Sequence, residues 1–124
     1  MVKWLSLALG SIVGGFSRYF LAGFVYQIFG TSFPYGTLVV NLIGCFLVGF
    51  LAALAEEKFL LGPNARVLLM VGFCGAFTTF STFMLETLNL TKDGEMFRAL
   101  LNILTSVILG FIVIRLGVLL GEII

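Results

Sequence analysis

Four long apolar stretches, separated by short breaks, dominate this chain of 124 residues. They cover approximately residues 4–29, 35–55, 67–90 and 97–120. A helix needs about 20 mostly apolar residues to cross the hydrocarbon core of a membrane, so each stretch is long enough to span it. A helix also satisfies its own backbone hydrogen bonds, which lipid cannot do. The sequence therefore predicts an all-α integral membrane protein with one domain, residues 1–124, of four transmembrane helices.

The composition and the breaks agree with this prediction. Hydrophobic residues make up 60% of the chain and charged residues 10%, against roughly 25% charged residues in ordinary globular domains. The only prolines, Pro34 and Pro63, fall in the breaks, where a missing N–H does least harm. The first stretch is too long for the core of a signal peptide, contains Arg18 and lacks a convincing cleavage site, so we expect it to remain in the protein.

Basic residues in the loops give only a weak preference for one orientation in the membrane. Because the number of spans is even, both termini and the middle loop lie on one side. That side carries Lys3, Lys58 and Arg66, against Lys92 and Arg98 on the other. Two interpretations follow. Either one topology is set weakly, or the chain inserts in both orientations and pairs with an inverted copy as an antiparallel homodimer.

Three ionisable side chains lie within the predicted spans, where charge is expensive and indicates function by default. Arg18 lies deepest, and a buried arginine needs an anion, a carboxylate or carbonyl groups. Glu86, towards the end of the third stretch, either lines an aqueous vestibule or simply extends towards water. Arg115 is close enough to the interface for its side chain to reach water. Asn41 adds a buried amide that can both donate and accept hydrogen bonds.

The segment GFCGAFTTFSTF, residues 72–83, combines four phenylalanines with small polar side chains and has no charge. Gly72 and Gly75, followed by Thr78 and Thr79, weaken a regular helix. We therefore expect the third helix to be broken near the membrane centre. Unwound backbone at that depth is tolerated where protein buries it or where it lines a cavity. The carbonyl groups freed there can bind a small hard cation.

Beyond the expected break, Phe80 and Phe83 are three residues apart and share a helix face. The edge of a phenyl ring carries positive charge. Two such edges, together with the amide N–H of Asn41, can hold a small anion weakly enough for it to leave again. The alternative is that both rings only pack. This alternative leaves the neighbouring hydroxyl groups of Ser81 and Thr82 unexplained.

The sequence contains three distinctive motifs: GGFSRY at 14–19, PYGTLVVNLIGCFLVG at 34–49, and GFCGAFTTFSTF followed by Glu86. Together they resemble the bacterial Fluc/CrcB fluoride channels. The resemblance covers the first three spans in order. It implies a passive fluoride channel of the bacterial inner membrane, built as an antiparallel homodimer with two pores that both subunits form. The expected partners are fluoride, a second copy and membrane lipid, with no nucleic acid and no enzymatic activity.

The resemblance also implies roles for individual residues. Phe80 and Phe83 would line the pore, with Asn41 beside them. The backbone carbonyls of Gly75 and Thr78, from both subunits, would hold a structural sodium ion (Na+) at the dimer axis. The remaining residues of the fluoride pathway would be Arg18 in the vestibule, together with Ser81, Thr82, Glu86 and Ser106.

Two other classes of protein are compatible with four membrane helices joined by short loops. A small proton-coupled multidrug exporter of the four-helix, dual-topology type needs an embedded carboxylate, and the first stretch offers Arg18 instead. A non-transporting assembly subunit or hole-forming protein needs only packing residues such as Gly10 and Gly14. It leaves Arg18, Asn41 and residues 72–83 without a purpose. The absence of histidine, a common proton relay, mildly favours a channel over a proton-coupled carrier.

Overall fold

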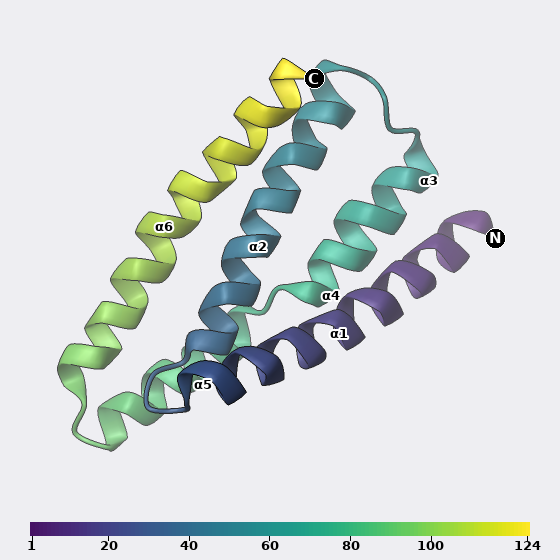
Figure 1. Cartoon of the computed structure of the whole chain (residues 1–124). Helices are drawn as coiled ribbons and strands as arrows, with labels where there is room; N and C mark the ends of the chain where they lie inside the picture. Colours follow the sequence, from purple (N-terminus) through teal and green to yellow (C-terminus); the bar gives the residue numbers. More distant parts are fainter.

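The structure, a computed structural model, describes residues 1–124 as helices joined by short connections (Figure 1). In chain order the helices are α1 (Val2–Phe29), α2 (Tyr35–Ala52), the π-helical η1 (Ala53–Glu57), α3 (Pro63–Arg66), the π-helical η2 (Val67–Cys74), α4 (Gly75–Phe77), α5 (Phe80–Lys92) and α6 (Met96–Ile123). Four segments are long and apolar enough to cross a membrane: Val2–Phe29, Tyr35–Glu57, Pro63–Lys92 and Met96–Ile123. The predicted all-helical fold with four spans is therefore confirmed.

Helices α2 and α6 lie side by side (Figure 1), and glycines bring their backbones into contact. A Cβ atom on Gly49 of α2 would lie 2.2 Å from the carbonyl oxygen of Ile114. A Cβ atom on Gly117 of α6 would lie 2.2 Å from the carbonyl oxygen of Phe46. Only glycine fits at either position. Such close approach gives the van der Waals contact that holds helices together in lipid, where the hydrophobic effect between helices is absent.

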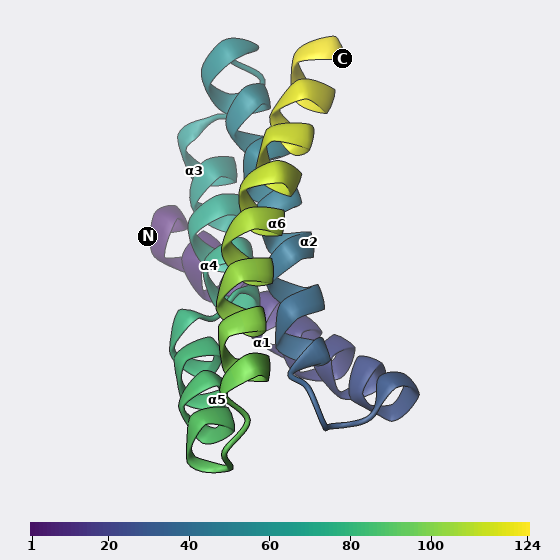
Figure 2. The ribbon, with the colours of Figure 1, turned by 90° about the vertical axis from the view of Figure 1, so that its left-hand side faces the viewer.

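Helix α1 crosses the other helices obliquely and packs on η2 and α4 (Figures 1 and 2). Its contact surface contains Gly10 and Gly14, two of the small residues whose helical spacing predicts close packing. An added Cβ atom would lie 2.1 Å from the Leu68 carbonyl oxygen at Gly10, and 2.3 Å from the Phe73 carbonyl oxygen at Gly14. The prediction of a packing role is confirmed at these two glycines.

The helical backbone of the third span is interrupted between α4 and α5. Thr78 (φ −90°, ψ 159°) and Thr79 (φ −151°, ψ 118°) are extended, whereas Gly75 keeps helical angles (φ −62°, ψ −37°). Gly72 is helical as well, and it packs against α1, where an added Cβ atom would lie 3.0 Å from the Leu7 carbonyl oxygen. The extended backbone thus falls on the two threonines, and the two glycines before them remain in helices.

The surface of the chain is strongly apolar. Only 22 of the 124 residues are buried, and many large hydrophobic side chains are exposed on every span. So many exposed apolar side chains are unfavourable in water. The C-terminus lies beside the connection between α2 and α3, and the α1–α2 and α5–α6 connections lie at the opposite end (Figure 1).

Candidate functional site

The side chain of Asn41, on α2, pairs with the extended backbone between α4 and α5. Its Oδ1 accepts a hydrogen bond from the Thr79 N–H (2.8 Å), and its Nδ2 donates to the Thr79 carbonyl oxygen (3.1 Å). The Thr79 hydroxyl accepts a hydrogen bond from the Thr82 N–H (3.2 Å) and so caps the start of α5. These bonds satisfy backbone groups that an apolar surrounding would leave unpaired. The second N–H of the Asn41 amide remains for another acceptor.

Two carbonyl groups beside the extended backbone lose their helical partners. In a continuous helix, the carbonyl of Gly75 would accept from the Thr79 N–H, and the carbonyl of Thr78 from the Thr82 N–H. The Thr79 N–H donates to Asn41 instead, and the Thr82 N–H donates to the Thr79 hydroxyl. Gly75 is also open to its surroundings, because no atom lies within 4 Å of an added Cβ.

An uncharged cleft of about 350 Å³, the aromatic cleft, opens between α2, α5 and α6. Its lining consists of Asn41, Gly44, Cys45, Val48, Thr78, Thr79, Phe80, Phe83, Ser106, Val107 and Ile114. The rings of Phe80 and Phe83 have centroids 5.9 Å apart and planes inclined by 59°. Phe83 is 7% exposed, whereas Phe80 is 72% exposed. The cleft therefore combines two aromatic rings, an amide and hydroxyl groups, and one of the two rings, Phe80, is largely exposed.

A second cleft of about 460 Å³, the charged cleft, lies between α1, α2 and a neighbouring face of α5. Its lining consists of Arg18, Tyr19, Ala22, Gly23, Tyr26, Gln27, Thr37, Val40, Thr79, Thr82 and Glu86. The half-buried Arg18 donates from Nε to the carbonyl oxygen of Ala76 (3.1 Å). A guanidinium group has five N–H donors. The remaining donors of Arg18 are therefore available to an anion in this cleft.

The carboxylate of Glu86 accepts one hydrogen bond on each oxygen. The Tyr26 hydroxyl, from α1, donates to Oε2 at 2.7 Å, and the Thr37 hydroxyl, from α2, donates to Oε1. The two hydroxyl oxygens lie 3.5 Å apart. Helix α5 continues beyond Glu86 to Lys92, so the carboxylate lies on the cleft wall and not at the helix end.

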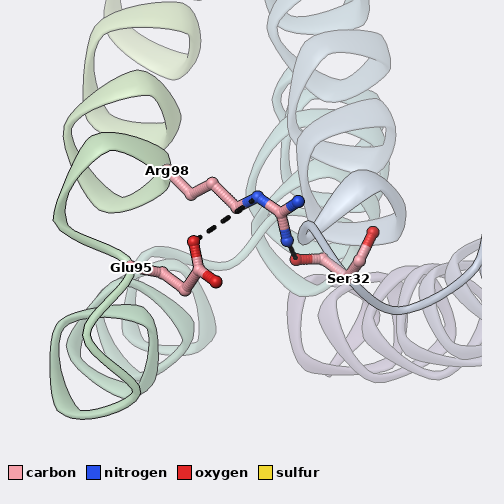
Figure 3. A network of polar contacts seen from close by, with 3 residues as sticks. All are labelled: Ser32, Glu95 and Arg98. Carbon is pink, nitrogen blue, oxygen red and sulfur yellow. Dashed lines mark hydrogen bonds and ion pairs between the residues drawn. The ribbon is translucent and has the colours of Figure 1, made fainter.

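A third cleft of about 390 Å³, the rim cleft, lies where the α1–α2 and α5–α6 connections meet. Its lining consists of Thr31, Ser32, Pro34, Glu86, Asn89, Leu90, Asp93, Glu95 and Arg98. Arg98 donates from Nη1 to the Ser32 carbonyl oxygen (3.1 Å), and its Nε lies 3.7 Å from Oε2 of Glu95 (Figure 3). These contacts tie the start of α6 to the α1–α2 connection. Glu86 lines both the rim cleft and the charged cleft.

The structure divides the predicted pathway residues between two clefts. Asn41, Phe80, Phe83 and Ser106 line the aromatic cleft, and Arg18, Thr82 and Glu86 line the charged cleft. Ser81 lines neither; it is exposed, with its hydroxyl 3.5 Å from that of Thr79. Thr79 lines both clefts and joins them.

Sequence reasoning did not assign Tyr26, Thr37 or Thr79 to the site, although their polar groups make the hydrogen bonds described above. A signal exists for Tyr26, which lies two helical turns after Arg18 and so shares its face. Thr37 likewise lies one turn before Asn41. No local signal separates the role of Thr79 from that of its neighbour, because the pairing with Asn41 depends on how α2 packs.

Four helices able to cross a membrane, packed around polar clefts, define a multi-pass membrane protein. The chain belongs to the CrcB family, because the family profile described as "CrcB-like protein, Camphor Resistance (CrcB)" matches residues 5–118. The resemblance that the three motifs indicate is thereby confirmed.

The names of similar proteins agree with this family assignment. The "Fluoride-specific ion channel FluC" of Citrifermentans bemidjiense is 48% identical over 108 residues, which cover 87% of this chain and 87% of that protein. The protein of the same name from Maridesulfovibrio salexigens is 46% identical over 124 residues, 100% of this chain and 98% of its own. A third, from Methylocella silvestris, is 46% identical over 118 residues, 94% and 90% of the two chains. These relatives are named as ion channels, and ion channels are not enzymes.

Proposed function

We propose that this protein is a channel through which fluoride crosses the membrane down its electrochemical gradient. Relatives named as fluoride-specific ion channels match the chain over most of its length. The observation that carries the proposal is the aromatic cleft, where Phe80, Phe83 and Asn41 meet without any charged side chain. Ring edges and an amide N–H attract a small anion without neutralising it. Fluoride can therefore enter this site and leave it again.

Passive flow is sufficient for export from a bacterial cell. Fluoride enters mainly as the neutral acid and is trapped as the anion near neutral pH. A potential that is negative inside favours anion exit by about 2.3 kcal/mol per charge per 100 mV. We infer that the channel lies in the bacterial inner membrane, with its exposed apolar side chains against lipid.

The charged cleft supplies the attraction that the aromatic cleft lacks. Arg18 keeps free N–H donors there, and its positive charge acts over a longer distance than ring edges do. Thr79, which lines both clefts, and Thr82, which lines the charged cleft, add hydroxyl groups. We propose that fluoride is drawn towards Arg18 and then passes these hydroxyl groups to reach the rings, with Ser81 and Ser106 as further hydroxyl donors.

We propose further that two copies in opposite orientations form the working channel, with two pores that each use residues of both copies. Phe80 belongs to the ring pair but is 72% exposed, and Gly75 is open. A second copy packed on this face would cover both residues. The nearly equal numbers of basic residues in the loops permit insertion in either orientation.

Topology can be tested with cysteine labelling. A cysteine at Asp93, in the α5–α6 connection, should react with an impermeant reagent from both sides of the membrane. Several lysines added near the N-terminus should fix one orientation and abolish fluoride release, and co-expression with an oppositely fixed copy should restore it. Labelling from one side only would contradict the antiparallel dimer.

We propose that the carbonyl oxygens of Gly75 and Thr78, from both copies, bind a structural sodium ion between them. The fit rests on their diverted helical partners, which leave lone pairs available. Four neutral oxygens suit a monovalent hard cation, whereas calcium prefers carboxylates. When bound, the ion would supply positive charge that offsets the carbonyl dipoles where the two copies meet.

Sodium dependence can be separated from side-chain effects. Replacing sodium by a large monovalent cation should destabilise the dimer in a chromatographic assay. Thr78→Ala should keep this dependence, because the backbone is the ligand. Gly75→Val should abolish dimerisation, although nothing in a single chain opposes the added side chain. Equal dimer stability with both cations would contradict the sodium site.

Ion release from liposomes tests the function itself. Purified protein should release fluoride rapidly, as followed with a fluoride electrode, and should release chloride no faster than empty liposomes. A proton-coupled multidrug exporter would give drug-dependent proton flux, and an assembly subunit would give neither flux. Absence of fluoride release would contradict the proposed channel.

A further inference from the structure

Glu86 lies at the boundary between the rim cleft and the charged cleft. This residue is the only one that lines both clefts. The rim cleft also carries Asp93, Glu95 and Arg98, and the charged cleft carries Arg18. A negative carboxylate at this point opposes the passage of an anion, so its position matters for conduction.

Hydroxyl groups from two other spans hold this carboxylate. Tyr26 of α1 donates to Oε2 at 2.7 Å, and Thr37 of α2 donates to Oε1. Each oxygen of Glu86 therefore has one fixed donor, and the side chain is drawn towards α1 and α2. Hydrogen bonds to an ionised group are the stronger ones, which makes this arrangement specific.

The position of the Tyr26 ring depends on a glycine. A Cβ atom at Gly36 would lie 2.5 Å from Cε2 and 2.8 Å from Cδ2 of Tyr26. The missing side chain at the start of α2 thus makes room for the ring, which places the hydroxyl next to Glu86. Thr37, the second donor, is the next residue along α2.

We propose that Tyr26 is a positioning residue, which together with Thr37 holds the Glu86 carboxylate against the α1–α2 wall and keeps the entrance between the two clefts open to fluoride. The inference rests on the proposed channel function. Without Tyr26, one carboxylate oxygen loses its donor. The side chain is then free to move into the passage or to pair with Arg18, the cation of the same cleft, and either change slows anion entry.

Fluoride release from liposomes containing the full-length protein tests this role. Tyr26→Phe keeps the ring and removes only the hydroxyl, and should lower the release rate by about tenfold, the scale of one lost hydrogen bond to a charged group. Thr37→Val removes the other donor with little change in shape, and should lower the rate similarly. Tyr35→Phe is the matched control, since its ring packs on Phe29 and Phe33 outside these clefts, and should release fluoride at the wild-type rate.

A double variant distinguishes positioning from general support of the fold. Because Glu86→Gln removes the charge that Tyr26 restrains, Tyr26→Phe/Glu86→Gln should release fluoride at the same rate as Glu86→Gln alone. A tenfold loss that persists in this background would overturn the inference, as would a wild-type rate for Tyr26→Phe. No release from the wild-type protein would instead overturn the channel function, and the inference with it.

Discussion

The aromatic cleft and the charged cleft lie against neighbouring faces of one short helix, α5, yet they differ in chemistry. The first has the Phe80 and Phe83 rings and no charge, whereas the second has Arg18 and Glu86. Full charges act over several ångströms, and ring edges act only at contact. In the proposed channel, this difference would separate the attraction of an anion from its weak binding, with Thr79 lining both clefts.

The largest effect is expected when the aromatic cleft loses its ring edges. Phe80→Ile and Phe83→Ile keep much of the bulk of the side chain but remove the aromatic edge that we propose binds fluoride. Each should lower fluoride release from liposomes by about 100-fold or more, since the lost contact raises the barrier directly. Size-exclusion chromatography should show an unchanged assembly.

The control for these variants is Phe97→Ile. Phe97 is 77% exposed at the start of α6 and lines none of the three clefts. The Phe97→Ile variant should therefore release fluoride at the wild-type rate. Unchanged release from both Phe80→Ile and Phe83→Ile would reduce the two rings to packing residues and remove the basis of the comparison.

An intermediate effect is expected when the charged cleft loses its cation. Arg18→Gln should lower fluoride release by about tenfold at low ionic strength and by less at high ionic strength, because salt screens the attraction. Arg115→Gln is the control, since Arg115 is exposed on α6 and lines none of the three clefts. An equal loss at both ionic strengths would instead assign Arg18 to support of the Ala76 carbonyl group.

The smallest effect is expected at the rim. The Arg98–Glu95 pair is about half exposed, with side-chain exposures of 44% and 48%. Exposed ion pairs contribute about 0–1 kcal/mol, so Arg98→Ala should lower thermal stability only slightly and leave fluoride release close to wild type. Thermal unfolding in detergent measures the first quantity. A strong loss of fluoride release would extend the charged entrance to the rim cleft.

Local sequence was sufficient for the membrane class and the four helices. Hydrophobicity over about 20 residues decides membrane insertion, and this property needs no knowledge of packing. The helix contacts of Gly10 and Gly14 could be predicted for a similar reason, because small residues at helical spacing mark close approach. The glycines of the third span were less informative, since Gly72 serves packing against α1 and Gly75 stays helical.

The motifs also identified several of the aromatic, amide and charged residues that line the clefts, because such side chains are unusual within a span. They did not show how these residues divide. Phe83 and Thr82 are adjacent in sequence but line different clefts, and Ser81 lines neither. A helix turns by about 100° per residue, so the orientation of α5 decides which side chain enters which cleft.

The sequence by itself determined that this chain crosses the membrane as four helices and that its third span contains rings and hydroxyl groups side by side. Only the tertiary structure decided which groups hold one another. Asn41 meets Thr79 across 38 residues of chain, and Tyr26 meets Glu86 across 60. Hydrophobicity is a property of each segment alone. Hydrogen bonds of this kind depend on the crossing of separate helices, which pack closely at glycines.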